Sequence, residues 1–136
     1  MITKKSKGFT IIELLVVVAI IAVLAAIVLV NVTSYINKGK DAAIKGNGST
    51  IQVNGAVYFD TNGNYTGFNT SNGYVGPANA ITSINVAPAI VLSATAYCVT
   101  AVLKDATTYC IDSTGFKGTL VSGKCTGGAT PVYTCQ

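Results

Sequence analysis

Hydrophobic positions dominate the beginning of the chain. From Leu14 to Val30 the sequence contains no charged or strongly polar side chain. At about 1.5 Å rise per residue, a helix over residues 9–30 can cross a hydrocarbon core of roughly 30 Å. Glu13 interrupts this pattern, and a charged side chain within an apolar span costs about 2.5–3.5 kcal/mol on insertion scales. The pattern predicts a membrane-spanning helix whose carboxylate has a partner or a function.

The helical pattern continues beyond the apolar segment. Over residues 31–60, apolar side chains recur at helical spacing and predict one stripe along a continued helix: Ile36, Ala43, Ile44, Ile51 and Tyr58. Four glycines weaken this prediction, since each costs about 1 kcal/mol relative to alanine in a helix interior. Residues 45–49 (KGNGS) are therefore where we expect fraying or a kink.

Residues 61–136 have the pattern of a small head. Asn62-Gly63 is a turn signal that ends the helix, and residues 73–88 form a mixed connection with at most a short strand or helical turn around 80–86. Residues 89–103 and 108–114 are rich in β-branched and aromatic side chains and predict a hairpin around a turn at 104–107. A further short strand is expected over 117–121. The predicted fold class is α+β, with a long N-terminal helix and a small antiparallel sheet.

Four cysteines lie in this head, and they allow three disulfide connectivities. We expect Cys98–Cys110, across the predicted hairpin, and Cys125–Cys135, because each pair closes a short local loop. The chain contains no histidine and no C-x-x-C pair, so a zinc site is not expected. Disulfides instead favour an oxidising exterior.

Composition and charge narrow the function classes. Half of the residues are hydrophobic and a tenth are charged, as suits a chain that buries one end in lipid or in an assembly. The net charge of +4 depends on Lys4, Lys5 and Lys7; without them, six lysines face five acidic residues, a balance of +1. The scattered acids and the absence of histidine provide no nucleophile–base pair and no carboxylate dyad. We expect neither an enzyme nor a cofactor.

Two weaker patterns suggest binding by the head. Lys104, Lys117 and Lys124 lie in predicted loops and could contact DNA or a surface, although lysines that only keep the head soluble fit the same pattern. Asp60, Asn62 and Asn64 alternate like the first ligands of a calcium loop. However, Tyr65 and Ser71 stand where that loop needs glycine and glutamate, so we interpret the segment as a plain turn after a helix rather than a calcium site.

The N-terminal stretch KGFTIIELLVVVAII carries a resemblance to a known family. A secretory signal peptide or a plain membrane anchor would also begin with lysines and an apolar run, but neither accounts for Gly8 and Glu13. A basic leader that ends in glycine, followed by Phe, Thr and a Glu four residues after the Phe, closely resembles the leaders of type IV prepilins and type II secretion pseudopilins. The resemblance implies that a prepilin peptidase cuts between Gly8 and Phe9 and methylates the new amino terminus at Phe9.

The resemblance also implies an architecture and a role. The domains would be a cleaved leader (1–8), a transmembrane or filament-core helix (9–30), an amphipathic continuation (31–60) and a disulfide-bonded head (61–136), together a pilin-like lollipop. The precursor would lie in the cytoplasmic membrane, in contact with lipid. The assembly machinery would then build a homo-oligomeric helical filament, an extracellular pilus for adhesion, motility or DNA uptake. The alternatives are a pseudopilin that drives protein export from a periplasmic filament, and a monomeric membrane-anchored binding module.

Glu13 acquires a specific role within this resemblance. Cleavage creates an ammonium at Phe9, and we hypothesise that Glu13 of an incoming subunit pairs with the Phe9 ammonium of a subunit already assembled. Opposite charges attract strongly at low dielectric, but desolvation offsets much of this gain, so the pair specifies register more than stability. Many relatives carry a helix-breaking proline in the apolar half, and this chain has none before Val30. We therefore expect the helix to remain unbroken there.

Overall fold

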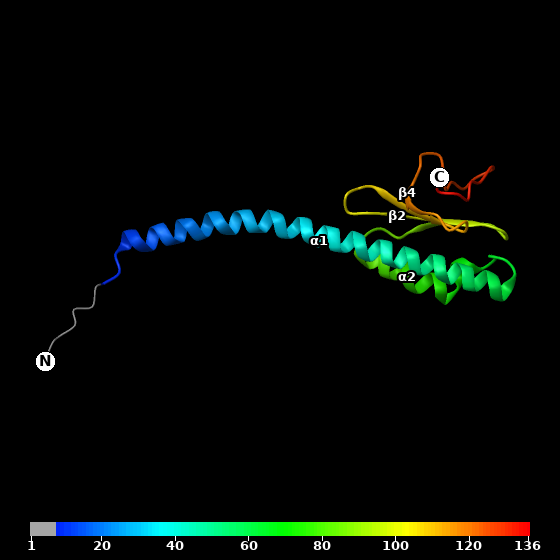
Figure 1. Cartoon of the computed structure of the whole chain (residues 1–136), viewed down its shortest axis with the longest axis horizontal. Coiled ribbons are helices and arrows are strands. Elements are labelled where there is room, and N and C mark those ends of the chain that lie inside the picture. The colour runs from blue at the N-terminus through cyan, green and yellow to red at the C-terminus, as the bar shows by residue number, and fades with distance from the viewer. Residues whose placement is uncertain (1–7) are drawn as a thin grey trace. The chain divides into compact units, whose positions relative to one another are not determined.

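The structure, a computed structural model, describes residues 8–136, and the order of its elements can be followed in Figure 1. The helices are α1 (Ile11–Asn62), the 3-10 helix η1 (Phe68–Thr70) and α2 (Asn72–Ile84). The strands are β1 (Ala89–Leu92), β2 (Tyr97–Val102), β3 (Thr108–Asp112) and β4 (Lys117–Thr119). The expected α+β class, a long N-terminal helix with a small antiparallel sheet, is confirmed.

Contacts divide the chain into two compact units, Met1–Ile36 and Asn37–Gln136. The described part of the first unit consists of the lead-in residues 8–10 and the apolar part of α1. The second contains the rest of α1, both shorter helices and the sheet. Its hydrophobic core is therefore built from α1 residues together with the head, so α1 supplies part of the folded head.

The sheet has the order β1-β2-β3-β4, with every neighbouring pair antiparallel. The predicted hairpin is confirmed as β2 and β3, and the expected last strand is found as β4. The segment 89–103 is not one strand, because a turn separates β1 from β2. The Ser93 hydroxyl accepts the backbone N–H groups of Thr95 and Ala96 and closes this turn.

The two faces of the sheet have different coverings. Tyr97, Val99 and Ile111 belong to the main core, which also contains Ile44 and Ile51 of α1. Alternate strand residues point to the opposite face. There the second cluster of buried residues, Cys98, Cys110 and Cys135, includes a cysteine from the C-terminal segment. The C-terminal segment therefore covers the face that α1 does not.

The buried face of α1 alternates isoleucine and glycine. Ile44, Gly48, Ile51 and Gly55 are buried at spacings of four, three and four residues, which place them on one side of the helix. A Cβ at Gly48 would lie 3.0 Å from Cε1 of Tyr109, and one at Gly55 would lie 2.5 Å from Oη of Tyr97. These two glycines let tyrosine rings of the sheet approach the helix backbone.

Two expectations about α1 are corrected by this packing. The helix does not fray at 45–49, since residues 45–49 are all helical, and burial against the sheet offsets the low helix propensity of glycine. Ile44 and Ile51 of the expected stripe are buried and Tyr58 is half-buried, but Ile36 is 51% exposed and Ala43 is also exposed. The buried face of α1 includes Gly48 and Gly55, which a pattern based on hydrophobic residues alone does not reveal.

Helix α2 differs from the expected mixed connection over 73–88, in which only a short strand or helical turn around 80–86 was foreseen. Its sequence contains Gly73, Gly76 and Pro77, which are poor helix formers. Pro77 lacks the N–H that would bond the Gly73 carbonyl four residues earlier. The Asn54 side chain of α1 donates Nδ2–H to this carbonyl at 2.8 Å. A tertiary hydrogen bond thus replaces the one that proline removes, and it fixes α2 against α1.

Replacing Gly55 by alanine tests the role of the buried glycines. We expect Gly55→Ala to lower the free energy of unfolding by about 1–3 kcal/mol, because the new Cβ collides with Tyr97. Gly46→Ala is the matched control, since nothing lies within 4 Å of its Cβ position, and it should raise stability by up to about 1 kcal/mol. Urea unfolding of the full chain in detergent, followed by circular dichroism, measures both. Equal gains from the two substitutions would contradict this packing.

Candidate functional site

The predicted processing bond lies just outside the first helix. Gly8, Phe9 and Thr10 precede α1 and are exposed, with Phe9 72% exposed. The remainder of the predicted leader, with Lys4, Lys5 and Lys7, lies outside the described residues. The Gly8–Phe9 peptide bond is therefore in an exposed, non-helical segment, the kind of backbone that a peptidase requires.

Thr10 and Glu13 form a reciprocal cap at the start of α1. The Glu13 carboxylate accepts the Thr10 backbone N–H at 2.9 Å and its hydroxyl at 2.8 Å, and the Thr10 hydroxyl oxygen accepts the Glu13 N–H at 3.3 Å. This T-x-x-E arrangement is a capping box, which satisfies donors that the first turn of a helix leaves unpaired. This role of Thr10 was not predicted from the sequence, although the T-x-x-E spacing could have shown it.

The side chains that follow form a long unpaired apolar surface. Between Phe9 and Leu29, every large hydrophobic side chain is exposed, by between 45% and 78%. Helix α1 contains a window of 18 residues with a mean hydropathy of 3.3, none of it buried within the chain. By length and composition it can cross a membrane. An apolar surface of this size requires lipid or other protein chains to cover it.

Sequence comparison agrees with this arrangement. Residues 3–29 match the prokaryotic N-terminal methylation motif. The chain carries the leader of type IV pilins and pseudopilins. No curated protein and no solved structure matched the chain. The motif indicates a type IV pilin or pseudopilin-like protein and implies processing by prepilin peptidase. Together with the apolar helix, it fits a membrane-anchored precursor.

The disulfides of this pilin-like head differ from the expected pairs. Cys98 binds Cys125 and Cys110 binds Cys135, with Cα–Cα distances of 5.7 and 5.8 Å. The expected Cys98–Cys110 bond is wrong because the register of β2 and β3 places Cys98 opposite Asp112 and Cys110 opposite Thr100. Both cysteines share a face but are offset by two residues. Each instead reaches the C-terminal segment that covers them.

The crossed pairs close longer loops than the expected ones. Their sequence separations are 27 and 25 residues. In the chain-entropy model, loops of this length restrict the unfolded chain by about 3.5 kcal/mol each. The last dozen residues, which contain no α-helix and only an isolated β-bridge, are held on the sheet at two points.

Asp112 provides a third attachment and was not identified from the sequence. It is fully buried, and one oxygen accepts N–H groups of Thr114 and Phe116 and the Thr114 hydroxyl, while the other accepts the Cys135 N–H at 2.9 Å. Its backbone carbonyl accepts a bond from Gln52 of α1. Asp112 therefore links the helix, the sheet and the C-terminal segment. Only its D-x-T spacing was visible in sequence.

Asp105 makes the same local bonds without burial. Its carboxylate accepts hydrogen bonds from the Thr107 hydroxyl and the Thr107 N–H. These bonds hold the pKa of Asp105 below its usual value, and the bond from the hydroxyl has the larger effect. Burial raises the pKa of Tyr65, Tyr74 and Tyr97, most of all for Tyr97. An ordinary tyrosine phenol is already protonated at neutral pH, and the upward shift extends this to more alkaline solution.

The other candidate binding residues have local roles in the structure. The Lys104 ammonium donates to Asn85 at 3.1 Å, and its backbone N–H donates to Asp41. Asn62 donates to the Tyr58 carbonyl, and Asn64 bonds within the turn after α1, so both contribute to ending the helix. Within residues 8–136, no group of three or more His, Cys, Asp or Glu side chains could hold a metal ion. Contact of the head with DNA or a surface stays a prediction.

Peptide mapping distinguishes the disulfide pairings. Trypsin cuts after Lys104, Lys117 and Lys124, so the crossed pairs must join peptides 46–104, 105–117 and 125–136 into one non-reduced product. Local pairs would instead give a two-peptide product and a separate looped 125–136. Further cleavage after tyrosines, including Tyr133, should leave Cys125 bonded to the fragment that holds Cys98, and Cys135 bonded to the fragment that holds Cys110. Mass spectrometry reads both digests, and the opposite assignment after the second cut would contradict the structure.

Removing the Asp112 charge should destabilise the head. In Asp112→Asn the new amide cannot accept all four donors, and we expect the free energy of unfolding to fall by about 2–4 kcal/mol. Asp105→Asn, which alters the same local turn at an exposed position, should leave it nearly unchanged. Chemical unfolding of both variants with intact disulfides provides the measurement. Similar values for the two would show that burial of Asp112 is unimportant.

Proposed function

We propose that the chain is a structural pilin, a subunit that polymerises through its N-terminal helix into an extracellular type IV pilus. The observation that carries the proposal is the exposed apolar segment of α1 that follows the leader in the sequence. Before assembly, lipid covers this surface in the membrane. In the filament, the same surfaces of neighbouring copies cover one another.

Glu13 couples assembly to processing in this proposal. Its carboxylate is turned back to the Thr10 N–H, one residue from the nitrogen that cleavage converts to an ammonium. Before cleavage that nitrogen is a neutral amide. Afterwards, Glu13 of an arriving subunit has a cation to pair with at the amino terminus of its neighbour. An unprocessed chain lacks this cation and is excluded from the filament.

The head then forms the outer surface of the pilus. With crossed disulfides and the Asp112 bonds, it suits an oxidising exterior. Adhesion, surface motility or DNA uptake are the functions that such a surface would serve. A structural subunit needs no catalytic group, in keeping with the type of leader.

Two substitutions separate the charge of Glu13 from its capping role. Glu13→Gln retains a residue that suits the third position of a capping box but removes the charge, and we expect filament yield to fall at least about tenfold, as for loss of a strong ion pair. Thr10→Ala removes the cap hydroxyl, retains the charge and should reduce yield much less. Electron microscopy and immunoblots of sheared surface material measure the yield.

The comparison of filament yields requires that every strain makes the subunit and processes it. Immunoblots of whole cells must show equal amounts of processed subunit in all strains. Normal filaments from Glu13→Gln would refute the ion pair. Absence of surface filaments from the unaltered chain, with loss of protein export on deletion, would replace the pilus by a pseudopilus. Function that survives without any assembly would indicate a monomeric anchored module.

A further inference from the structure

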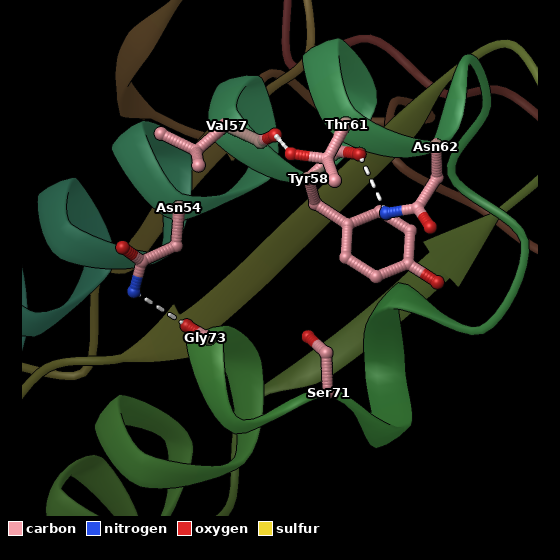
Figure 2. A pocket seen from close by; sticks show the side chains of 7 residues that line it. All are labelled: Asn54, Val57, Tyr58, Thr61, Asn62, Ser71 and Gly73. Atoms are coloured by element: carbon pink, nitrogen blue, oxygen red, sulfur yellow. Dashed lines mark hydrogen bonds between the residues drawn. The ribbon is translucent and has the colours of Figure 1, made fainter.

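A pocket of about 270 Å³ lies where the end of α1 meets η1 and the start of α2 (Figure 2). We name it the α1–α2 pocket. Its polar lining consists of five side chains: Asn54, Tyr58, Thr61, Asn62 and Ser71. It lies entirely within the second compact unit. Nothing in the assembly proposal gives it a role.

The polar side chains of the α1–α2 pocket are already fixed. Each donates one hydrogen bond to a backbone carbonyl, at 2.7–2.9 Å. The acceptors, in chain order of the donors, are the carbonyls of Gly73, Thr66, Val57, Tyr58 and Phe68. Because these bonds hold the side chains before a ligand arrives, binding would order little that is not ordered already.

The same bonds determine what the pocket can offer a ligand. The hydroxyl hydrogens of Tyr58, Thr61 and Ser71 are committed, so their oxygens retain only lone pairs as acceptors. Asn54 and Asn62 each keep a carbonyl oxygen and one N–H. The pocket therefore presents several acceptors and a few donors at close quarters. A molecule with several neighbouring hydroxyl groups can satisfy both kinds.

Electrostatics favour an uncharged ligand. No charged side chain lines the pocket. Thr61 and Asn62 lie in the last turn of α1, whose free carbonyls carry partial negative charge, while Ser71 and Gly73 lie at the start of α2, whose free N–H groups carry partial positive charge. The electrostatic potentials of these two helix ends have opposite sign and offset each other within the pocket, so neither an anion nor a cation is preferred.

Val57 and the Tyr58 ring provide an apolar part of the lining. Val57 is 60% exposed, and the Tyr58 ring packs against Phe68 with its centroid 5.4 Å away, leaving it only half-buried. Figure 2 shows the Tyr58 ring among the polar side chains of Thr61, Asn62 and Ser71. Drug-sized pockets occupy about 300–1,000 Å³, so this one suits a smaller molecule. A single sugar ring has this size, with an apolar C–H face and a rim of hydroxyls.

We propose that the α1–α2 pocket binds a neutral sugar residue. The Tyr58 ring and Val57 contact the C–H face of the sugar, and Thr61, Asn62 and Ser71 bond its hydroxyls. The proposal is independent of filament assembly, because every residue involved lies between positions 54 and 73.

Thr61 and Thr50 provide a matched pair for the test. Both are exposed, lie on α1 and donate the hydroxyl to the carbonyl four residues earlier, but only Thr61 lines the pocket. The full chain is held in a zwitterionic, sugar-free detergent and titrated with D-glucose, D-galactose or N-acetyl-D-glucosamine. D-Glucosamine and D-glucuronate serve as charged comparators. Nuclear magnetic resonance follows the side-chain amides of Asn54 and Asn62.

We expect at least one neutral sugar to shift both amides with a saturable, millimolar dissociation constant. Thr61→Val should weaken this binding about fivefold through loss of one hydrogen bond, and Thr50→Val should leave it unchanged. The proposal is overturned if no neutral sugar shifts these amides up to its solubility limit, if a charged comparator binds more tightly, or if both valine variants behave alike. Filament yield of Thr61→Val, measured separately, reports on assembly alone.

Discussion

The head depends on the close approach of two tyrosine rings to the backbone of α1. Tyr97 and Tyr109 point from the sheet to Gly55 and Gly48, and Ile44 and Ile51 fill the space between and beside these contacts. A larger residue at either glycine would separate helix and sheet. The interface is tight because these two positions have no side chain. The glycines alone would weaken the helix, and burial of the tyrosine rings offsets this loss.

Polar side chains add hydrogen bonds to the apolar contacts between the helices and the sheet. Asn54 satisfies the carbonyl that Pro77 leaves unpaired and so fixes α2, while Gln52 bonds the carbonyls of Asp112 and Phe116 at the β3–β4 turn. On the far face of the sheet, Asp112 and two disulfides hold a C-terminal segment that has little regular structure of its own. Because the core of the head is small, these attachments contribute much of its stability.

The apolar segment of α1 differs from the head because the chain itself does not cover its side chains. Its side chains have no partners within the described chain, and its first turn is completed by Thr10 and Glu13. The second compact unit therefore has a hydrophobic core of its own, whereas the apolar surface of the first requires lipid or other protein chains to cover it. The capping box gives Glu13 a role in the single chain besides the one proposed for it in assembly.

Local patterns in the sequence determined the leader, the existence of both parts of α1, the β2–β3 hairpin and the α+β class. These features depend on spacing over a few residues: an unbroken apolar run, a glycine before Phe9, alternating β-branched positions around a turn. The capping box was readable in the same way and was overlooked. Tertiary structure alone decided the partners of Cys98 and Cys110, the burial of Asp112, the stability of α2 and the purpose of Gly48 and Gly55. Each of these depends on which distant segment covers a given face, because strand register and helix packing bring together residues that no local spacing relates.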